Sequence, residues 1–430
     1  MLMKKLLLIL ILFAGIFSFV YPQNFNGRLS SSLYTFERFD SANTSTTYAR
    51  TFQMLNLNLG KQNVWLRSNM NFEGDLLESG SQIDNPRVRL YNLYLDVRDI
   101  WGAMFFKLGR QPIFNGLAGG VFDGGTLGLD YKGYKLFGYY GGNVPAYQDF
   151  EFTDDLSNDY ITGGEFTVYA LTDWRFSAKY VNKNFKNPAY DAIRLDPNLN
   201  PIDVTIANAS NKYEYLSGEI SYSMPKVFRV DSRYDYDMNF ETTSKVEVSG
   251  RYEQIENIGI SMYYNYREPR IRYNSIFSVF DYGNTWEIEG GVDYRIQNKY
   301  TISGKFANVS YNDETSQRLS LGLLSSFGGL TARKGFGYAG ELDAISLYGA
   351  HAVLDGLLTP TLGFSFTRYK QSETAPMNEL VSLMAGTNIR PWRFLSFDVQ
   401  GQYLNNKIYR NDWRLFLKVN YWFNTNLNLL

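Results

Sequence analysis

The chain has 430 residues, with 42 Lys and Arg residues against 43 Asp and Glu residues, one His and no Cys. The lack of Cys excludes a disulfide framework, a thiolate metal site and a Cys nucleophile, and a single His excludes a metal site built from several histidines. A net charge of -1 argues against a dedicated nucleic-acid binder, which needs a clustered basic surface, and the composition predicts no cofactor and no metal.

The N-terminus has the pattern of an export signal. Lys4 and Lys5 form a basic start, and Leu6–Val20 is an apolar run of 15 residues. This run is shorter than the ~20 residues that a helix needs to span a bilayer, and polar, alternating sequence begins at Gln23. We therefore expect residues 1–22 to be a signal peptide and residues 23–430 to be the mature domain. An uncleaved anchor is the alternative.

After the apolar run, apolar residues alternate with polar ones. Segments with this alternation begin near Val64, Trp174, Phe228, Val246, Trp286, Leu395 and Trp413. The chain also contains 34 Tyr and 31 Phe residues, which favour strands. A period of two predicts β-strands that have one apolar and one polar face. The chain is therefore predicted to be all-β.

Segment length distinguishes a membrane barrel from a soluble sandwich. Soluble strands usually have about 5 or 6 residues, whereas a tilted transmembrane strand needs about 9–11, and these segments repeatedly have the greater length. Short turns at residues 60–63, 131–134 and 224–227 alternate with longer polar stretches, such as residues 142–160, 184–211 and 267–283. This pattern predicts a transmembrane antiparallel β-barrel with short periplasmic turns and long extracellular loops. The alternative is a soluble, secreted β-repeat protein.

The number of strands is less well defined. The segments allow 22 candidate strands, but several are weak, and the Gly-rich residues 325–358 hold two strands or four. We expect an even number between 16 and 22 in one domain. A barrel of this width encloses a lumen that side chains alone do not fill. The loops are therefore expected to set the constriction.

The polar positions of the clearest strands carry charges of both signs. The basic members include Arg67, Arg175, Lys179, Arg229, Arg233, Lys245, Arg251, Arg295, Arg414 and Lys418, and the acidic members include Asp231, Asp235, Glu247, Glu253, Glu287, Glu289, Asp293 and Asp398. We expect them to line a polar channel, with Arg229, Arg233, Arg414 and Lys418 as candidates for tuning ion selectivity. The simpler interpretation of any one of them is that it pairs with a charge on a neighbouring strand.

One segment departs from the repeat, because Phe105–Pro112 is followed by a Gly-rich loop and then by Phe122–Gly125. The order Gly109-Arg110-Gln111 and then Phe122-Asp123-Gly124 resembles porin families such as alginate-export-like and phosphate-selective-porin-like barrels. The resemblance covers about 20 of the 430 residues. It implies a loop that folds into the barrel after this strand, with basic residues at the narrow part.

Alternation assigns the side chains of this segment to two faces. It places Lys107 and Gln111 inward and Arg110 outward, unless a bulge at Gly109 shifts the register. Lys107, Arg110, Gln111 and Asp123 are the candidate residues of the constriction. For Arg110 the alternative is a rim residue that pairs with Asp123 and holds the loop. The substrate class of the family does not carry over, because acidic residues dilute the basic wall.

A hydrolase is a competing function. Its nucleophile would need a base, usually a His. The single His351 lies in an alternating segment without a Gly-x-Ser-x-Gly element, so a packed histidine is the simpler interpretation. The same-face pair Glu287 and Glu289 is routine in a porin wall. We expect no enzyme activity, and for the acidic residues 149–159 a solvated loop competes with a Ca²⁺ site.

Together, these features predict a porin-like channel of the bacterial outer membrane. Small hydrophilic or charged solutes are expected to diffuse passively through a polar lumen that an inward loop narrows. The expected partners are outer-membrane lipid, these solutes and the barrel-insertion machinery, with no nucleic acid, and a homo-oligomer stays open. The alternatives are a non-conducting structural, receptor or adhesin barrel that uses loops such as residues 184–211, and an outer-membrane hydrolase.

The last predicted strand makes the two faces explicit. Leu415, Leu417 and Val419 share the apolar parity, whereas Asn420 has the polar parity. We expect arginine to destabilise the barrel at the first three positions and to be tolerated at Asn420.

Overall fold

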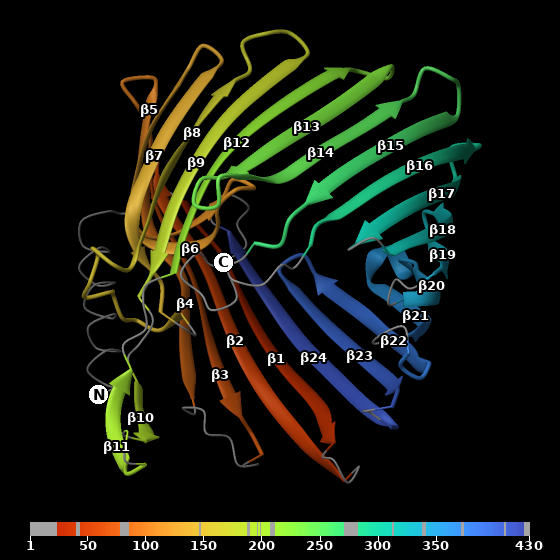
Figure 1. Cartoon of the computed structure of the whole chain (residues 1–430). Coiled ribbons are helices and arrows are strands. Elements are labelled where there is room, and N and C mark those ends of the chain that lie inside the picture. Colours follow the sequence, from red (N-terminus) through yellow and green to blue (C-terminus); the bar gives the residue numbers. More distant parts are fainter. Residues whose placement is uncertain are drawn as a thin grey trace.

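The alternating segments pair side by side into one antiparallel sheet that closes on itself (Figure 1). The computed structural model describes residues 24–39, 44–77, 86–145, 148–186, 190–195, 197, 199–206, 211–270, 283–311, 314–337, 341–370, 374–407 and 410–424. In this part of the chain 22 strands form the barrel. The prediction of an even number between 16 and 22 is therefore confirmed at its upper limit.

Each barrel strand pairs with the barrel strands that precede and follow it. The barrel strands are β1 (Asn24–Phe39), β2 (Ser45–Lys61), β3 (Val64–Asp75), β4 (Arg87–Ile100), β5 (Met104–Phe114), β6 (Gly119–Tyr131), β7 (Tyr134–Asn143), β8 (Tyr160–Val168), β9 (Trp174–Phe185), β12 (Asn211–Met224), β13 (Phe228–Asp237), β14 (Thr242–Tyr252), β15 (Ile258–Arg267), β16 (Thr285–Ile296), β17 (Tyr300–Tyr311), β18 (Glu314–Ser325), β19 (Gly328–Phe336), β20 (Glu341–Ala350), β21 (Leu358–Tyr369), β22 (Asn378–Trp392), β23 (Leu395–Asn405) and β24 (Asp412–Asn424). Pairing of β1 with β24, from Asn26 opposite Asn424 to Thr35 opposite Leu415, closes the ring. The strands have between 9 and 17 residues, which confirms the long segments expected from the sequence.

The connections alternate in length, as predicted. On one side of the barrel, turns such as residues 62–63 and 132–133 join neighbouring strands, whereas on the other side the strands are joined by loops such as residues 144–159. The connection between β9 and β12 contains a separate hairpin, β10 (Tyr190–Leu195) and β11 (Pro201–Ile206), which projects away from the barrel (Figure 1). A 3₁₀ turn, η3 (Leu354–Gly356), lies between β20 and β21. No helix of the described residues is long and apolar enough to cross a membrane.

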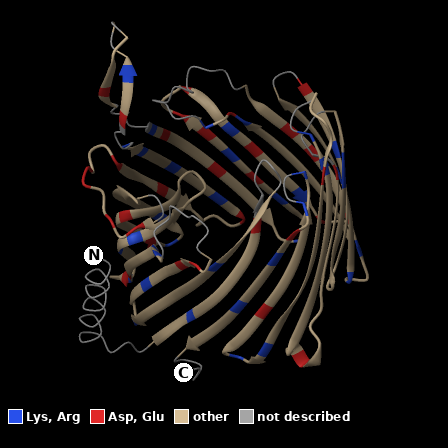
Figure 2. Ribbon diagram, turned by 90° about the horizontal axis from the view of Figure 1, so that it is seen from below, with Lys and Arg blue, Asp and Glu red and all other residues tan. Residues whose placement is uncertain are grey.

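Side chains of each strand alternate between an apolar outer face and a polar inner face. On β23, Val399 is 40% exposed on the outer face, next to Asp398 and Gln400 on the inner face. Charges of both signs lie on many strands around the wall (Figure 2). Many of them pair across strands, as predicted: Arg67 with Asp96, Arg251 with Asp293, Lys305 with Glu289, and Arg318 with Glu287. The predicted signal peptide, residues 1–22, lies outside the described residues.

Asn420 has a structural role that alternation does not reveal. Asn420 is 4% exposed, and its side chain joins three strands at the point where the barrel closes. Ser30 Oγ donates a hydrogen bond to Asn420 Oδ1 at 2.7 Å, and Asn420 Nδ2 donates to Ser396 Oγ at 3.2 Å and to Asp398 Oδ2 at 3.0 Å. The expectation that arginine is tolerated here is corrected, because a longer cation would break these three hydrogen bonds.

We predict that Asn420→Leu destabilises the barrel by about 1–3 kcal/mol, because it leaves buried polar partners unsatisfied. The free energy of unfolding in urea measures this effect. The matched control is Gln400→Leu, since Gln400 lies on the same face of the neighbouring strand β23 and makes no hydrogen bond among the described side chains. Equal destabilisation by both substitutions would contradict the role of the Asn420 network.

Candidate functional site

The hairpin of β5 and β6 leaves the barrel wall before it ends. β5 pairs with β4 only as far as Arg110, which lies opposite Leu93, and β6 pairs with β7 only as far as Phe122, which lies opposite Asn143. Beyond these points, β5 and β6 pair only with each other, up to Phe114 opposite Gly119. We call residues 111–121 the tip of this hairpin.

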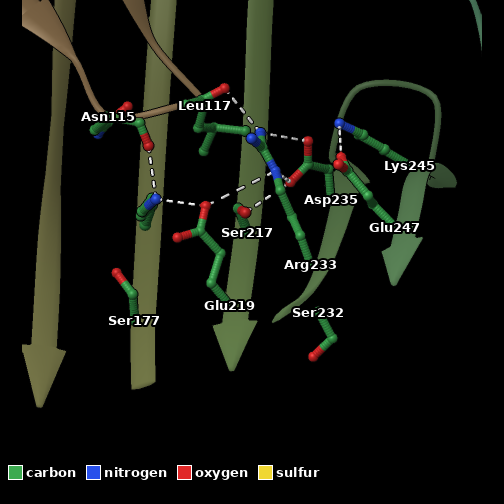
Figure 3. Close-up of polar contacts among 12 residues, drawn as sticks. Asn115, Leu117, Ser177, Ser217, Glu219, Ser232, Arg233, Asp235, Lys245 and Glu247 are labelled. Atoms are coloured by element: carbon green, nitrogen blue, oxygen red, sulfur yellow. Dashed lines mark hydrogen bonds and ion pairs between the residues drawn. The ribbon is translucent and has the colours of Figure 1, made fainter. Parts of the chain in front are cut away.

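The tip lies inside the lumen, against the wall formed by β9, β12 and β13. Three successive backbone carbonyls of its turn accept hydrogen bonds from basic side chains: Asn115 O from Lys179 Nζ at 2.6 Å, Gly116 O from Arg233 Nη2 at 2.8 Å, and Leu117 O from Arg270 Nη1 at 3.4 Å. Gly116 has a φ of 83°, and a Cβ there would lie 2.9 Å from Arg233 Nη1. Glycine therefore allows the arginine to approach the turn. Figure 3 shows Asn115 and Leu117 above the inward side chains of these strands.

A buried carboxylate orients two of the three basic side chains. Asp235 is 0% exposed and accepts two hydrogen bonds from Arg233, both at 2.7 Å, and one from Arg270 at 3.1 Å. Ser217 Oγ donates a fourth hydrogen bond to Asp235 at 2.6 Å (Figure 3). Because the carboxylate has all its acceptor positions engaged, it fixes the guanidinium groups at the height of the tip.

Apolar packing holds the other side of the tip. Phe122 is 0% exposed, and its ring centroid lies 5.7 Å from that of Tyr139. The buried cluster around it joins the tip to the wall and consists of Ile113, Leu117, Ala118, Phe122, Tyr139, Ile161, Val181 and Tyr215. Buried aromatic and aliphatic contacts of this kind add to the polar anchors. The tip is therefore fixed to one side of the lumen.

Gln111 is part of the framework of the hairpin. Its residue is 1% exposed; its Nε2 donates to Gly124 O at 2.9 Å, and Thr126 Oγ1 donates to its Oε1 at 2.8 Å. The expected inward direction agrees with the register, but the side chain serves the structure of the hairpin.

Arg110 and Asp123 form a buried ion pair on the face opposite Lys107 and Gln111. Arg110 is 2% exposed, its Nε and Nη2 each lie 2.8 Å from the Asp123 carboxylate, and no register shift occurs at Gly109. Gly109 is required at this point, because its φ is 121° and a Cβ would lie 2.4 Å from Leu93 O. The candidate role of Arg110 and Asp123 in the constriction is corrected, since their side chains do not face the lumen.

Arg110 instead ties down the segment of residues 148–156. Its guanidinium donates to the carbonyls of Asp149 at 2.7 Å, Glu151 at 3.0 Å and Gln148 at 3.2 Å. The same segment packs on Gly142, where a Cβ would lie 2.4 Å from Thr153 Cγ2. The segment thus covers β5 and β6 at the point where their hairpin leaves the wall. This arrangement fits the alternative role considered for Arg110, that of a rim residue that pairs with Asp123 and holds a loop.

The acidic residues 149–159, which overlap this segment, are held by hydrogen bonds and ion pairs with nearby residues. Ser157, Asn158 and Lys186 all interact with the carboxylate of Asp155, and their hydrogen bonds hold the pKa of Asp155 well below its usual range. Asn143 Nδ2 donates to Asp159 at 2.7 Å. In the described part of the chain, no three His, Cys, Asp or Glu residues are placed to hold a metal ion. His351 packs edge-on against Phe327, with ring centroids 4.9 Å apart.

The remaining candidates are spread along the inner wall. Lys107 lies in the lumen with its Nζ 5.9 Å from the ring centroid of Tyr94. Arg229 pairs with Asp231 at 2.7 Å, and Arg414 pairs with Asp412 at 2.6 Å, each on its own strand. Lys418 lies opposite Asp398. Of the candidate residues, Lys107 and Gln111 line the same cavity beside the hairpin, Arg110 and Asp123 pair with each other within the hairpin, and Arg233 contacts its tip.

Alternation alone could not single out three residues of the anchor. Lys179 and Asp235 were predicted to face inward, but nothing in the sequence distinguishes them from other charges on that face. Arg270 lies three residues after β15, in a long polar stretch without a pattern. These residues are recognised as a group only in the fold, because Arg270 and Leu117, which are in contact, are 153 positions apart in the sequence.

The comparisons with known proteins show the fold and no family. No family model matches the chain, and no curated protein matches it. A mutant of the ferric enterobactin receptor (PfeA) from Pseudomonas aeruginosa is similar with a TM-score of 0.58 and 9% identity, over 94% of this chain and 80% of that chain. The P pilus usher (PapC) translocation pore has a TM-score of 0.46 and 8% identity, over 92% and 99%. OccK1 (OpdK) from P. aeruginosa has a TM-score of 0.43 and 9% identity, over 94% and 99%.

We predict that Arg110→Met destabilises the folded barrel by about 3–5 kcal/mol, because it leaves the Asp123 carboxylate buried and unpaired. Urea unfolding of the variant measures the change. The control is Arg229→Met, which breaks an Arg–Asp pair whose arginine side chain is 65% exposed, and it should cost at most about 1 kcal/mol. The double variant Arg110→Met and Asp123→Asn should regain part of the lost stability, because no buried charge is left unpaired. A loss of stability in Arg229→Met without a loss in Arg110→Met would contradict the prediction.

Proposed function

We propose that the chain is a channel of the bacterial outer membrane through which small hydrophilic or charged solutes diffuse passively. The proposal is carried by one observation, the tip of the β5–β6 hairpin anchored on the inner wall of a 22-stranded barrel. A barrel of this width has a lumen too large for side chains alone to fill, so an inward segment sets its narrowest part. The tip is the segment that does so in this chain.

The outer face supports a place in a membrane. Its strands are long enough to cross a hydrocarbon core when tilted, and their outward side chains are apolar. Exposed aromatic residues lie beside the short turns: Trp101, 89% exposed, Tyr131, 55%, Tyr134, 51%, and Trp392, 56%. Amphipathic rings at strand ends suit the boundary between lipid and water. The short turns then face the periplasm.

The polar wall supports passive movement of solutes. Ion pairs between strands cancel much of the charge, and the remaining polar groups interact with water and small solutes. The tip contacts β9, β12, β13 and the segment after β15, which all lie on one side of the ring. An obstruction attached to one side narrows a wide lumen without filling it.

A receptor barrel is the second candidate. The number of strands favours it, because 22-stranded transporters of the outer membrane normally carry a plugged lumen. The ferric enterobactin receptor (PfeA) mutant, to which the chain is similar with a TM-score of 0.58, is also a receptor barrel by its name. Conductance of the purified chain in a planar bilayer separates the two, since a channel conducts without partners and a plugged barrel does not.

We predict that deletion of Asn115–Gly120 raises the single-channel conductance, because it removes the turn that projects into the lumen. Planar-bilayer recording checks this result. The control is a shortened β10–β11 hairpin, which projects away from the barrel and should leave the conductance unchanged. An unchanged conductance of the folded deletion variant would place the constriction elsewhere.

We predict that Val399→Arg destabilises the barrel by ~2–4 kcal/mol in lipid vesicles, because water does not reach a guanidinium in the hydrocarbon core. The neighbouring change Gln400→Arg places the same side chain in the lumen and should be tolerated. The free energy of unfolding measures both. Similar losses at the two positions would reject the assignment of the outer face to lipid.

A further inference from the structure

A cavity of about 390 Å³ lies between the β5–β6 hairpin and the inner wall. Side chains of β5, β7, β8 and β9 contribute its charged lining. Its lining includes Phe105, Lys107, Phe137, Glu165, Arg175 and Lys179, with Lys135 at its edge shared with a second cavity. The cavity therefore adjoins the tip of the hairpin and shares one of its anchors, Lys179.

Among the described residues, three cations of this cavity have no carboxylate within ion-pair distance, although Lys107 lies opposite Asp96 of β4. Lys107, Lys135 and Arg175 form no ion pair within the described residues, whereas Lys179 is paired with Glu219 at 2.5 Å. Glu165 accepts hydrogen bonds from Thr167 and Ser177 and is not within ion-pair distance of any described cation. The cavity thus has an excess of positive charge in a lumen where many charges are paired.

Two aromatic rings give the same cavity an apolar surface. The ring centroids of Phe105 and Phe137 lie 6.4 Å apart. Lys135 Nζ lies 5.6 Å from the centroid of Phe105 and 5.8 Å from that of Phe137. The cation therefore sits beside the rings, where one ligand can contact an ammonium group and an apolar surface at the same time.

The cavity continues toward the short-turn side of the barrel. A second cavity of about 370 Å³ shares Phe105, Lys107 and Lys135 with it and extends to Gly102 in the turn between β4 and β5. The two cavities therefore adjoin each other along β5. A solute in the lumen can reach the unpaired cations through them.

We infer that this cavity binds a small organic anion that has an apolar body, such as an aromatic carboxylate. The carboxylate would lie among Lys107, Lys135 and Arg175, and the body would lie against Phe105 and Phe137. Lys107 and Lys135 are half-buried and form no ion pair among the described residues, so they attract an anion more strongly than cations on the open wall do, and the exposed Arg175 adds to this attraction. The inference rests on the proposed channel only for the route by which the anion enters.

Isothermal titration of the purified full chain, folded in detergent, tests the inference. The probe is sodium phenylacetate, and the comparison ligands are acetate, inorganic phosphate and phenethylammonium. Phenylacetate should bind most tightly, because it alone offers both the charge and the ring. Equal or tighter binding of acetate, phosphate or phenethylammonium overturns the inference.

Substitutions of the three cations test whether phenylacetate binds in this cavity. The triple variant Lys107→Gln, Lys135→Gln and Arg175→Gln should raise the Kd for phenylacetate by about tenfold or more, since each charged hydrogen bond is lost. The matched control is Arg295→Gln, an inward cation of β16 that also has no ion pair among the described residues, and it should leave the Kd unchanged. If the triple variant does not fold, Lys135→Gln and Arg175→Gln are measured singly. An unchanged Kd in the cavity variants overturns the inference.

Bilayer recording keeps this test separate from the proposed function. A wild-type barrel that conducts but does not bind phenylacetate overturns the anion site and leaves the channel intact. A barrel that binds phenylacetate in a Lys107-, Lys135- and Arg175-dependent manner supports the site, whether or not it conducts.

Discussion

The structure depends on the pairing of backbone N–H and C=O groups. A sheet surrounded by lipid has no water to satisfy an open edge, so every strand needs a partner on both sides. Pairing of β1 with β24 meets this requirement over ten positions, and the Asn420 side chain adds bonds to β1 and β23 at the same place. The remaining features follow from how the chain departs locally from this closed ring.

The hairpin of β5 and β6 is such a departure, and its basic residues compensate for it. Beyond the point where the hairpin leaves the wall, the backbone carbonyls of its turn have no neighbouring strand to pair with. Lys179, Arg233 and Arg270 donate hydrogen bonds to these carbonyls instead. On the opposite face, Arg110 donates to carbonyls of residues 148–151 and so closes the wall beside the hairpin. Basic side chains suit this task, because Arg and Lys each carry several N–H donors and no acceptor, so one side chain can satisfy more than one carbonyl.

The sequence predicts the properties that are local. A period of two needs only neighbouring residues, so it gives the strands, the two faces and the outward direction of Arg110 correctly. The Gly-rich residues 325–358 resist this reasoning, because glycine carries no side chain to report a face, and the structure places β19 and β20 there. The anchor of the tip is not predictable in this way. Arg233 meets Gly116 over 117 positions, and only the closed ring brings them together.

The proposed anion site is also a property of the fold and not of the local sequence, so it cannot be found by counting charges along the chain. Over the whole sequence, basic and acidic residues nearly cancel, and their alternation on single strands suggests a neutral wall. In space, however, three carboxylates near the hairpin are committed to other cations: Asp96 binds Arg67 and Arg98, Glu219 binds Lys179, and Asp235 binds Arg233 and Arg270. Because these carboxylates hold the framework, Lys107, Lys135 and Arg175 form no ion pair among the described residues, and the cavity that they line has only Glu165 as an acidic lining residue. The framework of the constriction and the charge of the cavity beside it therefore have one common origin.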